Sequence, residues 1–212
     1  MRNGSAVLFD WDGTLVDTAE ASYRCYVRLF GELGVPFDRE IYARTYSPNW
    51  YHTFRQLGVP EDRWPHADER WLAHFADEPV ELIDGVRDAL DELGRRGVAV
   101  GVVTSGSRER VAREIRAHGL GMIRESVFGC DVARKKPHPE ALQLCLSRLG
   151  VAPGEAVYVG DSPEDMEMAR AAGVYAVAVP GGYPNRRALL ASRPDALHGS
   201  VLAAVRALTG TG

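Results

Sequence analysis

From residue 84 onward, short apolar runs alternate with amphipathic segments, and this alternation strongly constrains the fold. The spacing predicts helices at 85–96, 107–118, 139–149, 163–172 and 200–208. Strands are predicted between them at 98–103, 126–128, 156–159 and 175–179. Chains that alternate in this way form a parallel sheet with helices on both faces. We therefore expect an α/β fold with a doubly wound parallel sheet.

The N-terminal segment is expected to join the same sheet. Residues 6–9 form an apolar run that stops at Asp10, and Asp12 follows in a predicted loop. A lone strand could not bury its apolar faces, so residues 1–16 and 84–212 belong to one core domain. In a parallel sheet, ligands bind at the carboxyl ends of the strands. The two acids are therefore expected to lie in a crevice.

Residues 17–83 follow a different pattern and are predicted to be a helical insertion. Apolar residues keep helical spacing from Tyr23 to Leu33. Prolines separate further predicted helices at 39–46, 49–57 and 64–76. No strand pattern is present between 18 and 83. Twelve aromatic residues fall in this stretch, which suits the core of a small helical bundle.

The composition argues against several classes of function. With 29 acidic and 25 basic residues the formal net charge is -4, whereas nucleic-acid-binding domains are typically basic. The longest apolar runs fall far short of the roughly twenty residues that cross a bilayer. The N-terminal stretch lacks the pattern of a secretory signal, and Cys25, Cys130 and Cys145 lack metal-binding spacing. We expect a cytoplasmic protein with buried free thiols that binds neither nucleic acid nor a membrane.

Four segments at or after predicted strand ends carry polar residues that can act together. They are Asp10 and Asp12, then Thr104 to Gly106, then Lys136, and finally Asp161 to Asp165. Parallel topology gathers these segments at one edge of the sheet. Mg²⁺ commonly takes one or two carboxylates together with a substrate phosphate, which suits Asp10 and Asp161. A hydroxyl, a lysine and backbone amides beside such a cation favour phosphoryl transfer.

With these motifs the chain resembles the haloacid dehalogenase superfamily, and within it the phosphoglycolate-phosphatase-like members. The motifs occur in order along the chain as Asp10-Trp11-Asp12-Gly13-Thr14, Thr104, Lys136 and Gly160-Asp161 to Asp165. The resemblance covers essentially the whole chain. It implies a Rossmann-like core with an α-helical cap domain at 17–83. It also implies a Mg²⁺-dependent phosphatase that hydrolyses a small phosphorylated metabolite, a phosphate monoester, through an aspartyl phosphate.

The resemblance implies a role for each motif residue. Asp10 would attack phosphorus, while Asp12 would protonate the leaving oxygen and then activate water. Mg²⁺ would bind the Asp10 carboxylate, the Asp12 carbonyl and Asp161, with Asp165 acting through water. The phosphoryl group would be held by Lys136, Thr104 and the amides of Trp11, Asp12, Ser105 and Gly106.

Several alternatives stay open at this point. Asp165 is also the third residue of a helix that Ser162 can cap, and Thr104 is also an ordinary β-branched strand residue. A sugar phosphomutase of the same superfamily would share every core motif, and a regulatory protein with a vestigial site is a third possibility. Asp12 argues against dehalogenation, because the dehalogenases lack this second acid.

The junction at 46–52 combines aromatic and polar side chains, with two arginines nearby. In the family that the chain resembles, such cap residues face the nucleophile and select the leaving group. We expect this role for Arg44, Trp50, His52 and Arg55, because a basic residue could hold a second anionic group of the substrate. The sequence leaves open which metabolite is bound and whether the protein is a monomer or a homodimer.

Overall fold

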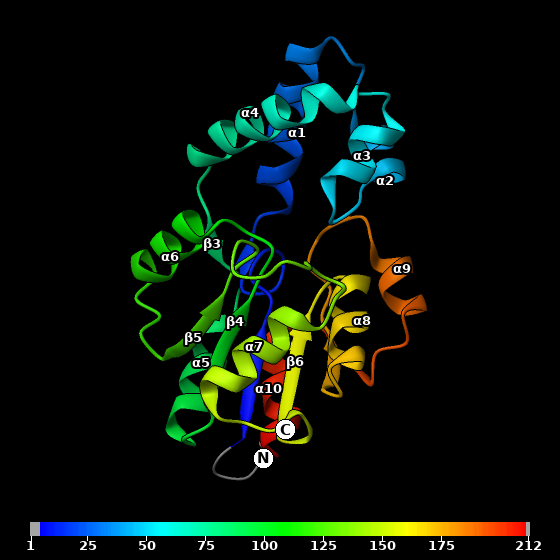
Figure 1. Cartoon of the computed structure of the whole chain (residues 1–212). Helices are drawn as coiled ribbons and strands as arrows, with labels where there is room; N and C mark the ends of the chain where they lie inside the picture. The colour runs from blue at the N-terminus through cyan, green and yellow to red at the C-terminus, as the bar shows by residue number, and fades with distance from the viewer. Residues whose placement is uncertain (1–4, 211–212) are drawn as a thin grey trace.

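The structure, a computed structural model, describes residues 5–210 and is built around a six-stranded parallel sheet. The strand order is β5-β4-β1-β6-β7-β8 (Figure 1). The strands are β1 (Ala6–Phe9), β4 (Ala99–Val103), β5 (Ile123–Val127), β6 (Ala156–Gly160), β7 (Tyr175–Ala178) and β8 (Ala196–Leu197). The predicted doubly wound parallel sheet is confirmed.

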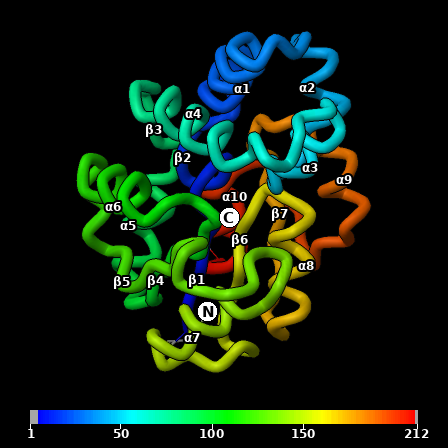
Figure 2. Tube along the Cα trace, turned by 45° about the horizontal axis from the view of Figure 1, so that its top comes forward, coloured from blue at the N-terminus to red at the C-terminus, as the bar shows by residue number. Residues whose placement is uncertain are grey.

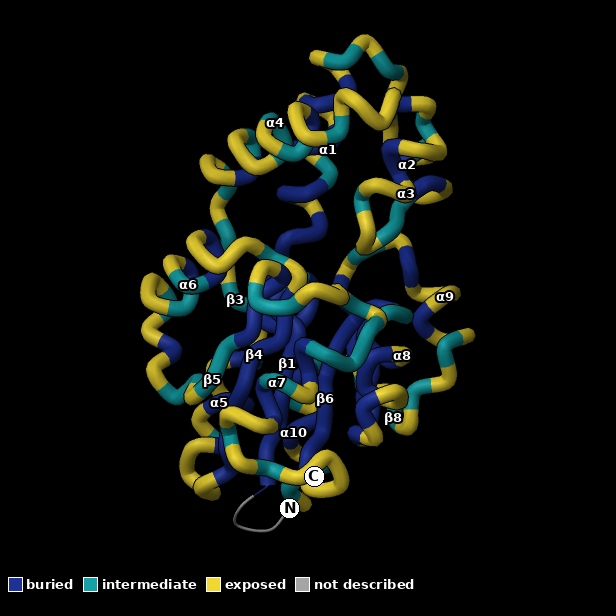
Figure 3. The backbone as a smooth tube through the Cα atoms, in the orientation of Figure 1, coloured by how far each residue is buried: buried dark blue, intermediate teal, exposed yellow. Residues whose placement is uncertain are grey.

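Helices cover both faces of this sheet. One face packs against α5 (Val86–Arg95), α6 (Arg108–Ala117) and α10 (Val201–Thr209). The other packs against α7 (Glu140–Leu149), α8 (Pro163–Ala171) and α9 (Arg186–Ala191). In β1, Val7 and Phe9 belong to the first core cluster, while Ala6 and Leu8 belong to the second. The central strands are therefore buried on both faces, as the dark trace in Figure 3 shows.

The insertion forms a helical group at one end of the molecule, beyond the carboxyl edge of the sheet (Figures 1 and 2). It consists of α1 (Ala19–Leu33), α2 (Arg39–Thr45), α3 (Trp50–Gln56), the 3-10 turn η1 (Glu61–Arg63) and α4 (Trp64–Ala76). Its own core is largely aromatic and includes Tyr26, Phe30, Tyr42 and Phe54. The predicted helices of this segment are confirmed to within a residue or two.

A short antiparallel pair connects the insertion to the core, and the sequence did not predict it. β2 (Val16–Asp17) pairs with β3 (Glu81–Leu82), with Val16 opposite Leu82. The Ile83 amide continues the contact by donating to the Leu15 carbonyl at 3.0 Å. The prediction that no strand lies between 18 and 83 is therefore wrong. A strand of two residues has no alternation from which to recognise it.

The C-terminal half differs from the prediction at three further places. β5 begins at Ile123, three residues before the predicted start, and its partly exposed side chains weaken the apolar signal. Neither α9 nor β8 was predicted, because α9 has six residues and β8 has two. The three cysteines are free and Cys25 and Cys145 are buried, as expected, but Cys130 is exposed, so the prediction of a buried thiol is wrong there. Within residues 5–210, no helix is both long and apolar enough to cross a membrane.

Candidate active site

Three buried polar residues follow neighbouring strands at the carboxyl edge of the sheet. Asp10 follows β1, Thr104 follows β4, and Asp161 follows β6. Because β1 pairs in parallel with both β4 and β6, the three strand ends lie next to each other. The fold thus brings together residues from three of the four predicted polar segments, and Lys136, from the fourth, contacts Asp10.

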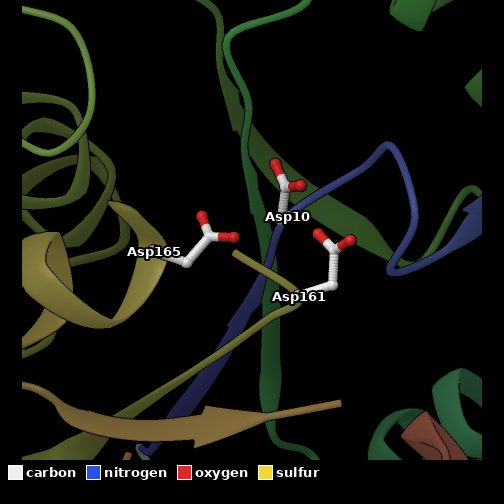
Figure 4. Close-up of side chains that lie close together, drawn as sticks. All are labelled: Asp10, Asp161 and Asp165. Atoms are coloured by element: carbon white, nitrogen blue, oxygen red, sulfur yellow. The ribbon is translucent and has the colours of Figure 1, made fainter. Parts of the chain in front are cut away.

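The carboxylates of Asp10, Asp161 and Asp165 form a compact acidic group (Figure 4). One oxygen from each residue lies within 4.8 Å of the oxygens from the other two. All three residues are buried, and Asp161 Oδ2 has no hydrogen-bond partner among the described residues. Buried polar groups are normally partnered, and carboxylate oxygens are the ligands that hard divalent cations prefer. These residues therefore fit such a cation.

Burial changes the acidity of this group. Desolvation raises the pKa of Asp10 to about 7, although the charge of Lys136 lowers it. Desolvation, followed by repulsion from Asp10, raises the pKa of Asp161 well above its ordinary value. A bound cation would favour the ionised carboxylates, so cation binding and proton release are coupled at this site.

Lys136 places its ammonium group between two of the acids. Its Nζ donates to Asp10 Oδ1 at 2.6 Å and to Asp165 Oδ1 at 2.7 Å. It also donates to the Tyr158 hydroxyl at 2.8 Å, and that hydroxyl donates to the Val103 carbonyl at 2.9 Å. Burial alone would lower the pKa of Lys136, but the two carboxylates raise it overall. The lysine is therefore held in its charged form beside Asp10.

Asp165 also caps the helix on which it lies. Its Oδ2 accepts from the Ser162 amide at 3.1 Å and from the Ser162 hydroxyl at 2.7 Å. The Asp165 amide donates back to Ser162 Oγ at 3.2 Å, which completes a capping box at the start of α8. The structural interpretation of Asp165 is confirmed. It does not compete with a place in the acidic group, because Oδ1 is the atom that contacts Lys136.

The loop after β4 forms a tight turn into α6. Thr104 Oγ1 accepts from the Gly106 amide at 3.0 Å, and Ser107 caps the helix. A Cβ at Gly106 would lie 2.7 Å from the Arg110 guanidinium and 2.9 Å from Val111, so the close packing requires glycine. The turn ends at a helix N-terminus, whose unsatisfied amides favour an anion.

Arg110 is a site residue that sequence reasoning missed. Its guanidinium donates to Asp12 Oδ1 at 3.0 Å and to Asp12 Oδ2 at 2.5 Å. It also forms an ion pair with Glu114 at 3.2 Å, one turn further along α6. Burial would lower the pKa of Arg110, but Asp12 raises it. The only signal in the sequence was the spacing of Arg110 and Glu114, which fits a helical ion pair but not a partner in a distant loop.

Trp11 lies apart from the other predicted phosphoryl-binding residues. Its ring is fully buried, and Nε1 donates to Glu114 Oε2 at 2.7 Å. The cavity between the core and the insertion is lined by Asp12, Thr104, Ser105, Gly106 and Lys136 but not by Trp11. The expected contribution of its backbone amide stays a prediction.

A cavity of about 240 Å³ lies between the core and the insertion. Asp10, Asp12 and Asp161 line its core side, whereas Asp165 lies behind them. This volume is below the roughly 300–1,000 Å³ of pockets that take drug-sized ligands. The cavity therefore suits a small substrate whose reacting group meets the acidic cluster.

The structure brings only one of the four predicted cap residues to this cavity. Trp50 lines it, whereas Arg44, His52 and Arg55 do not. Arg55 forms an exposed ion pair with Glu61 at 3.1 Å. Tyr46 and Tyr51, from the junction that the sequence singled out, also line the cavity. The rings of the cavity wall that sequence reasoning missed are Tyr26, Trp71 and Tyr183.

Comparison with known proteins places the chain among its relatives. The chain is 32% identical to pyrophosphatase PpaX of Bacillus velezensis, with 90% of each protein covered. It is 31% identical to phosphoglycolate phosphatase of Salmonella choleraesuis, over 94% of the chain and 90% of that protein. The crystal structure of CbbY from Rhodobacter sphaeroides in complex with phosphate shares the fold, with a TM-score of 0.75. It is 30% identical, and the match covers 95% of the chain and 96% of CbbY.

The family assignment rests on a match to most of the chain. Residues 7–179 match the family described as haloacid dehalogenase-like hydrolase. This range includes β1, the insertion and the core up to the end of β7, and it therefore contains every motif that carried the resemblance. The chain belongs to the haloacid dehalogenase-like hydrolases.

Proposed function

We propose that this protein is a Mg²⁺-dependent phosphatase that hydrolyses a small phosphate monoester through an aspartyl phosphate. The observation that carries the proposal is the arrangement around Asp10. Its buried carboxylate lies beside Asp161 and Asp165, contacts Lys136, and opens onto the cavity. Phosphoryl transfer depends mainly on positioning and charge stabilisation, which is what this set of groups supplies.

In the proposed reaction the bond changes are divided between two aspartates. An Asp10 oxygen attacks phosphorus, and the bond between phosphorus and the leaving oxygen breaks while Asp12 gives that oxygen a proton. Asp12 then takes a proton from a water molecule whose oxygen attacks phosphorus. The bond between phosphorus and the Asp10 oxygen breaks, which releases phosphate and regenerates the Asp10 carboxylate. In the present structure the Arg110 guanidinium donates to both carboxylate oxygens of Asp12. Because both oxygens are engaged in this way, delivery of a proton to the leaving oxygen requires the contact to loosen.

Asp10, Asp161 and the Asp12 carbonyl would hold the Mg²⁺ ion, with Asp165 behind them. When bound, the cation supplies positive charge that offsets the negative charge of the phosphoryl group. Lys136 and Thr104 orient the phosphoryl oxygens, and the amides at the start of α6 complete the cradle.

We also propose that residues 17–83 act as a cap over the site. The short pair of β2 and β3 is the connection about which the cap would move, because few contacts hold a two-residue ladder. Closure would exclude water from the leaving-group side of the cavity. The cytoplasmic location and the choice between monomer and homodimer remain predictions.

The function is tested by measuring phosphate release from a panel of phosphorylated metabolites. We expect Mg²⁺-dependent release that EDTA abolishes reversibly. Asp10→Asn should eliminate it, whereas Asp91→Asn on the exposed side of α5 provides the matched control and should retain it. Release without a bisphosphate activator argues against the phosphomutase alternative. A panel with no Asp10-dependent release would favour the vestigial alternative.

A further inference from the structure

The cavity wall contributed by the insertion is aromatic and uncharged. Its large side chains are Tyr26, Tyr46, Trp50, Tyr51, Trp71 and Leu72. The polar groups on this side are neutral, and Ser47 and Asn49 are examples. Within the described part of the chain, no residue from 17–83 that lines the cavity is charged. This half of the cavity faces the side where the leaving group of a substrate bound at Asp10 would lie.

Ring contacts hold this wall in place. Trp50 stacks on Trp71 with ring centroids 5.6 Å apart and an angle of 26° between the planes. Tyr46 stacks on Tyr183 at 5.0 Å and 16°, and this contact connects the insertion to the core. Tyr51 donates its hydroxyl to Asp68, so its polar end is already engaged. The rings therefore offer preformed apolar surface, which favours binding because little side-chain order has to be gained.

Two of the three cations around the cavity are already paired with acids of the core. Arg110 contacts Asp12, and Lys136 contacts Asp10. Lys135 is exposed at the cavity and forms the third cation of its lining. Two of the three cations are thus neutralised within the site. An anion on the leaving group would have to compete with Asp12 and Asp10 for these two cations.

A carboxyl group on the same lining further disfavours a second anion. Glu164 lines the cavity, and its Oε2 is buried without a hydrogen-bond partner among the described residues. An anionic leaving group would meet this acid and the aromatic wall, and it would lose its hydration without gaining a cation from the insertion.

We infer that the substrate is a phosphate monoester of a small, uncharged alcohol with an apolar or ring-shaped body. The inference rests on the proposed phosphatase function and specifies its leaving group. Phosphoglycolate carries a carboxylate, and pyrophosphate carries a second phosphoryl group. The substrate of this protein therefore differs from those in the names of its two relatives.

The direct test compares benzyl phosphate with 4-carboxybenzyl phosphate as substrates of the wild-type enzyme with Mg²⁺. The two esters share the bond that breaks and the ring, and they differ in one carboxylate. We expect kcat/KM to be about tenfold higher for benzyl phosphate, mainly through a lower KM, because the carboxylate would be desolvated against an insertion wall that offers it no cation. Equal values, or a preference for the carboxylated ester, would overturn the inference.

A variant at the cavity wall tests the same point by adding the missing cation. Leu72 lines the cavity on α4 and is 40% exposed, so Leu72→Arg is compatible with folding. The new guanidinium should shift the ratio of the two kcat/KM values toward the carboxylated ester by about fivefold or more. Leu190→Arg is the matched control, because Leu190 is a 44% exposed helical leucine outside the cavity lining. An unchanged ratio in Leu72→Arg would contradict the placement of the leaving group.

Different results would contradict the phosphatase function and the inference about its leaving group. Asp10-dependent hydrolysis of the carboxylated ester in preference to benzyl phosphate would overturn the leaving-group inference and leave the phosphatase function intact. If neither these esters nor the metabolite panel gave Asp10-dependent phosphate release, the proposed function and the inference would both be wrong.

Discussion

The surroundings of the Asp161 side chain disfavour its ionised form when no cation is bound. Its Oδ2 is buried and has no hydrogen-bond partner within residues 5–210, and the backbone packs so closely that Gly13 and Gly181 leave no room for a Cβ beside it. Gly13 also has a φ of 80°, which favours glycine. A cation bound to this oxygen would explain the close packing, because it would offset the negative charge of the carboxylate.

Replacing the Asp161 carboxylate should raise the thermal stability in EDTA and remove the stabilisation by Mg²⁺. Because the pKa of folded Asp161 is raised, its ionisation lowers the free energy of unfolding as the pH rises above the ordinary aspartate range. Asp161→Asn removes that effect, so its Tm in EDTA at pH 8 should exceed the wild-type Tm by about 2 °C or more. Mg²⁺ should raise the Tm of the wild type but not of the variant.

Thermal unfolding in EDTA and in Mg²⁺ measures both effects, with Asp91→Asn as the control. A variant that is less stable than the wild type in EDTA and equally stabilised by Mg²⁺ would argue against this account.

Asp10 predicts a pH dependence for metal binding. Its pKa in the metal-free protein is about 7, and a cation binds the ionised form. Protons therefore compete with the cation below pH 7, and the affinity for Mg²⁺ should weaken about tenfold between pH 8 and pH 6. Isothermal titration calorimetry at the two pH values provides the measurement. The same affinity at both values would contradict the assigned acidity of the site.

At the scale of elements, α6 is connected to the loop after β1 through buried polar contacts. Arg110 bridges Asp12 and Glu114, and Glu114 also accepts from the Trp11 indole. The ring of Phe75, from α4 of the insertion, lies 4.9 Å from the same guanidinium. One arginine therefore contacts the acid-base candidate, the core helix and the cap.

Removing Arg110 should destabilise the protein because Glu114 would remain as a buried charge. We expect Arg110→Met to lower the free energy of unfolding by about 3 kcal/mol or more. The double variant Arg110→Met, Glu114→Gln removes that charge and keeps an acceptor for Trp11, so it should recover part of the loss. Urea unfolding with equal m-values provides the comparison. If the double variant is no more stable than Arg110→Met, the isolated charge is not the cause.

The elements that could be predicted from the sequence are those long enough for their apolar residues to show the repeat of a helix or a strand. The strands around β1 and the longer helices satisfy this condition, and the chain order of βα units then requires the parallel sheet. β2, β3 and β8 have two residues each, so pairing rather than pattern defines them. Their partners lie far away in the sequence, and no local signal identifies such partners.

At the scale of the whole molecule, the core part of the site was more predictable than the cap part. Asp10 and Asp161 could be placed because every carboxyl end of a parallel strand lies at the same edge. Arg110 could not, because its partner Asp12 comes from another element. The expectation for Arg44 and Arg55 relied on their nearness in sequence to an aromatic junction, which does not determine the direction of a helical side chain.

The core and the cap meet in one cavity, and this arrangement gives the chain two separable functions. In the proposed function the core supplies the chemistry, whereas the insertion supplies a wall of rings. Substitutions in the core should therefore change turnover on every substrate, and substitutions in the insertion should change the ranking of substrates.

The most direct test of the central claim is to trap the phosphoryl group on the enzyme. The wild type is mixed with a substrate and Mg²⁺, quenched in acid during turnover and digested for mass spectrometry. We predict a hydroxylamine-sensitive phosphoryl group on Asp10 and none in Asp10→Asn. A phosphoryl group on a different residue, or full phosphate release by Asp10→Asn, would contradict the proposed mechanism.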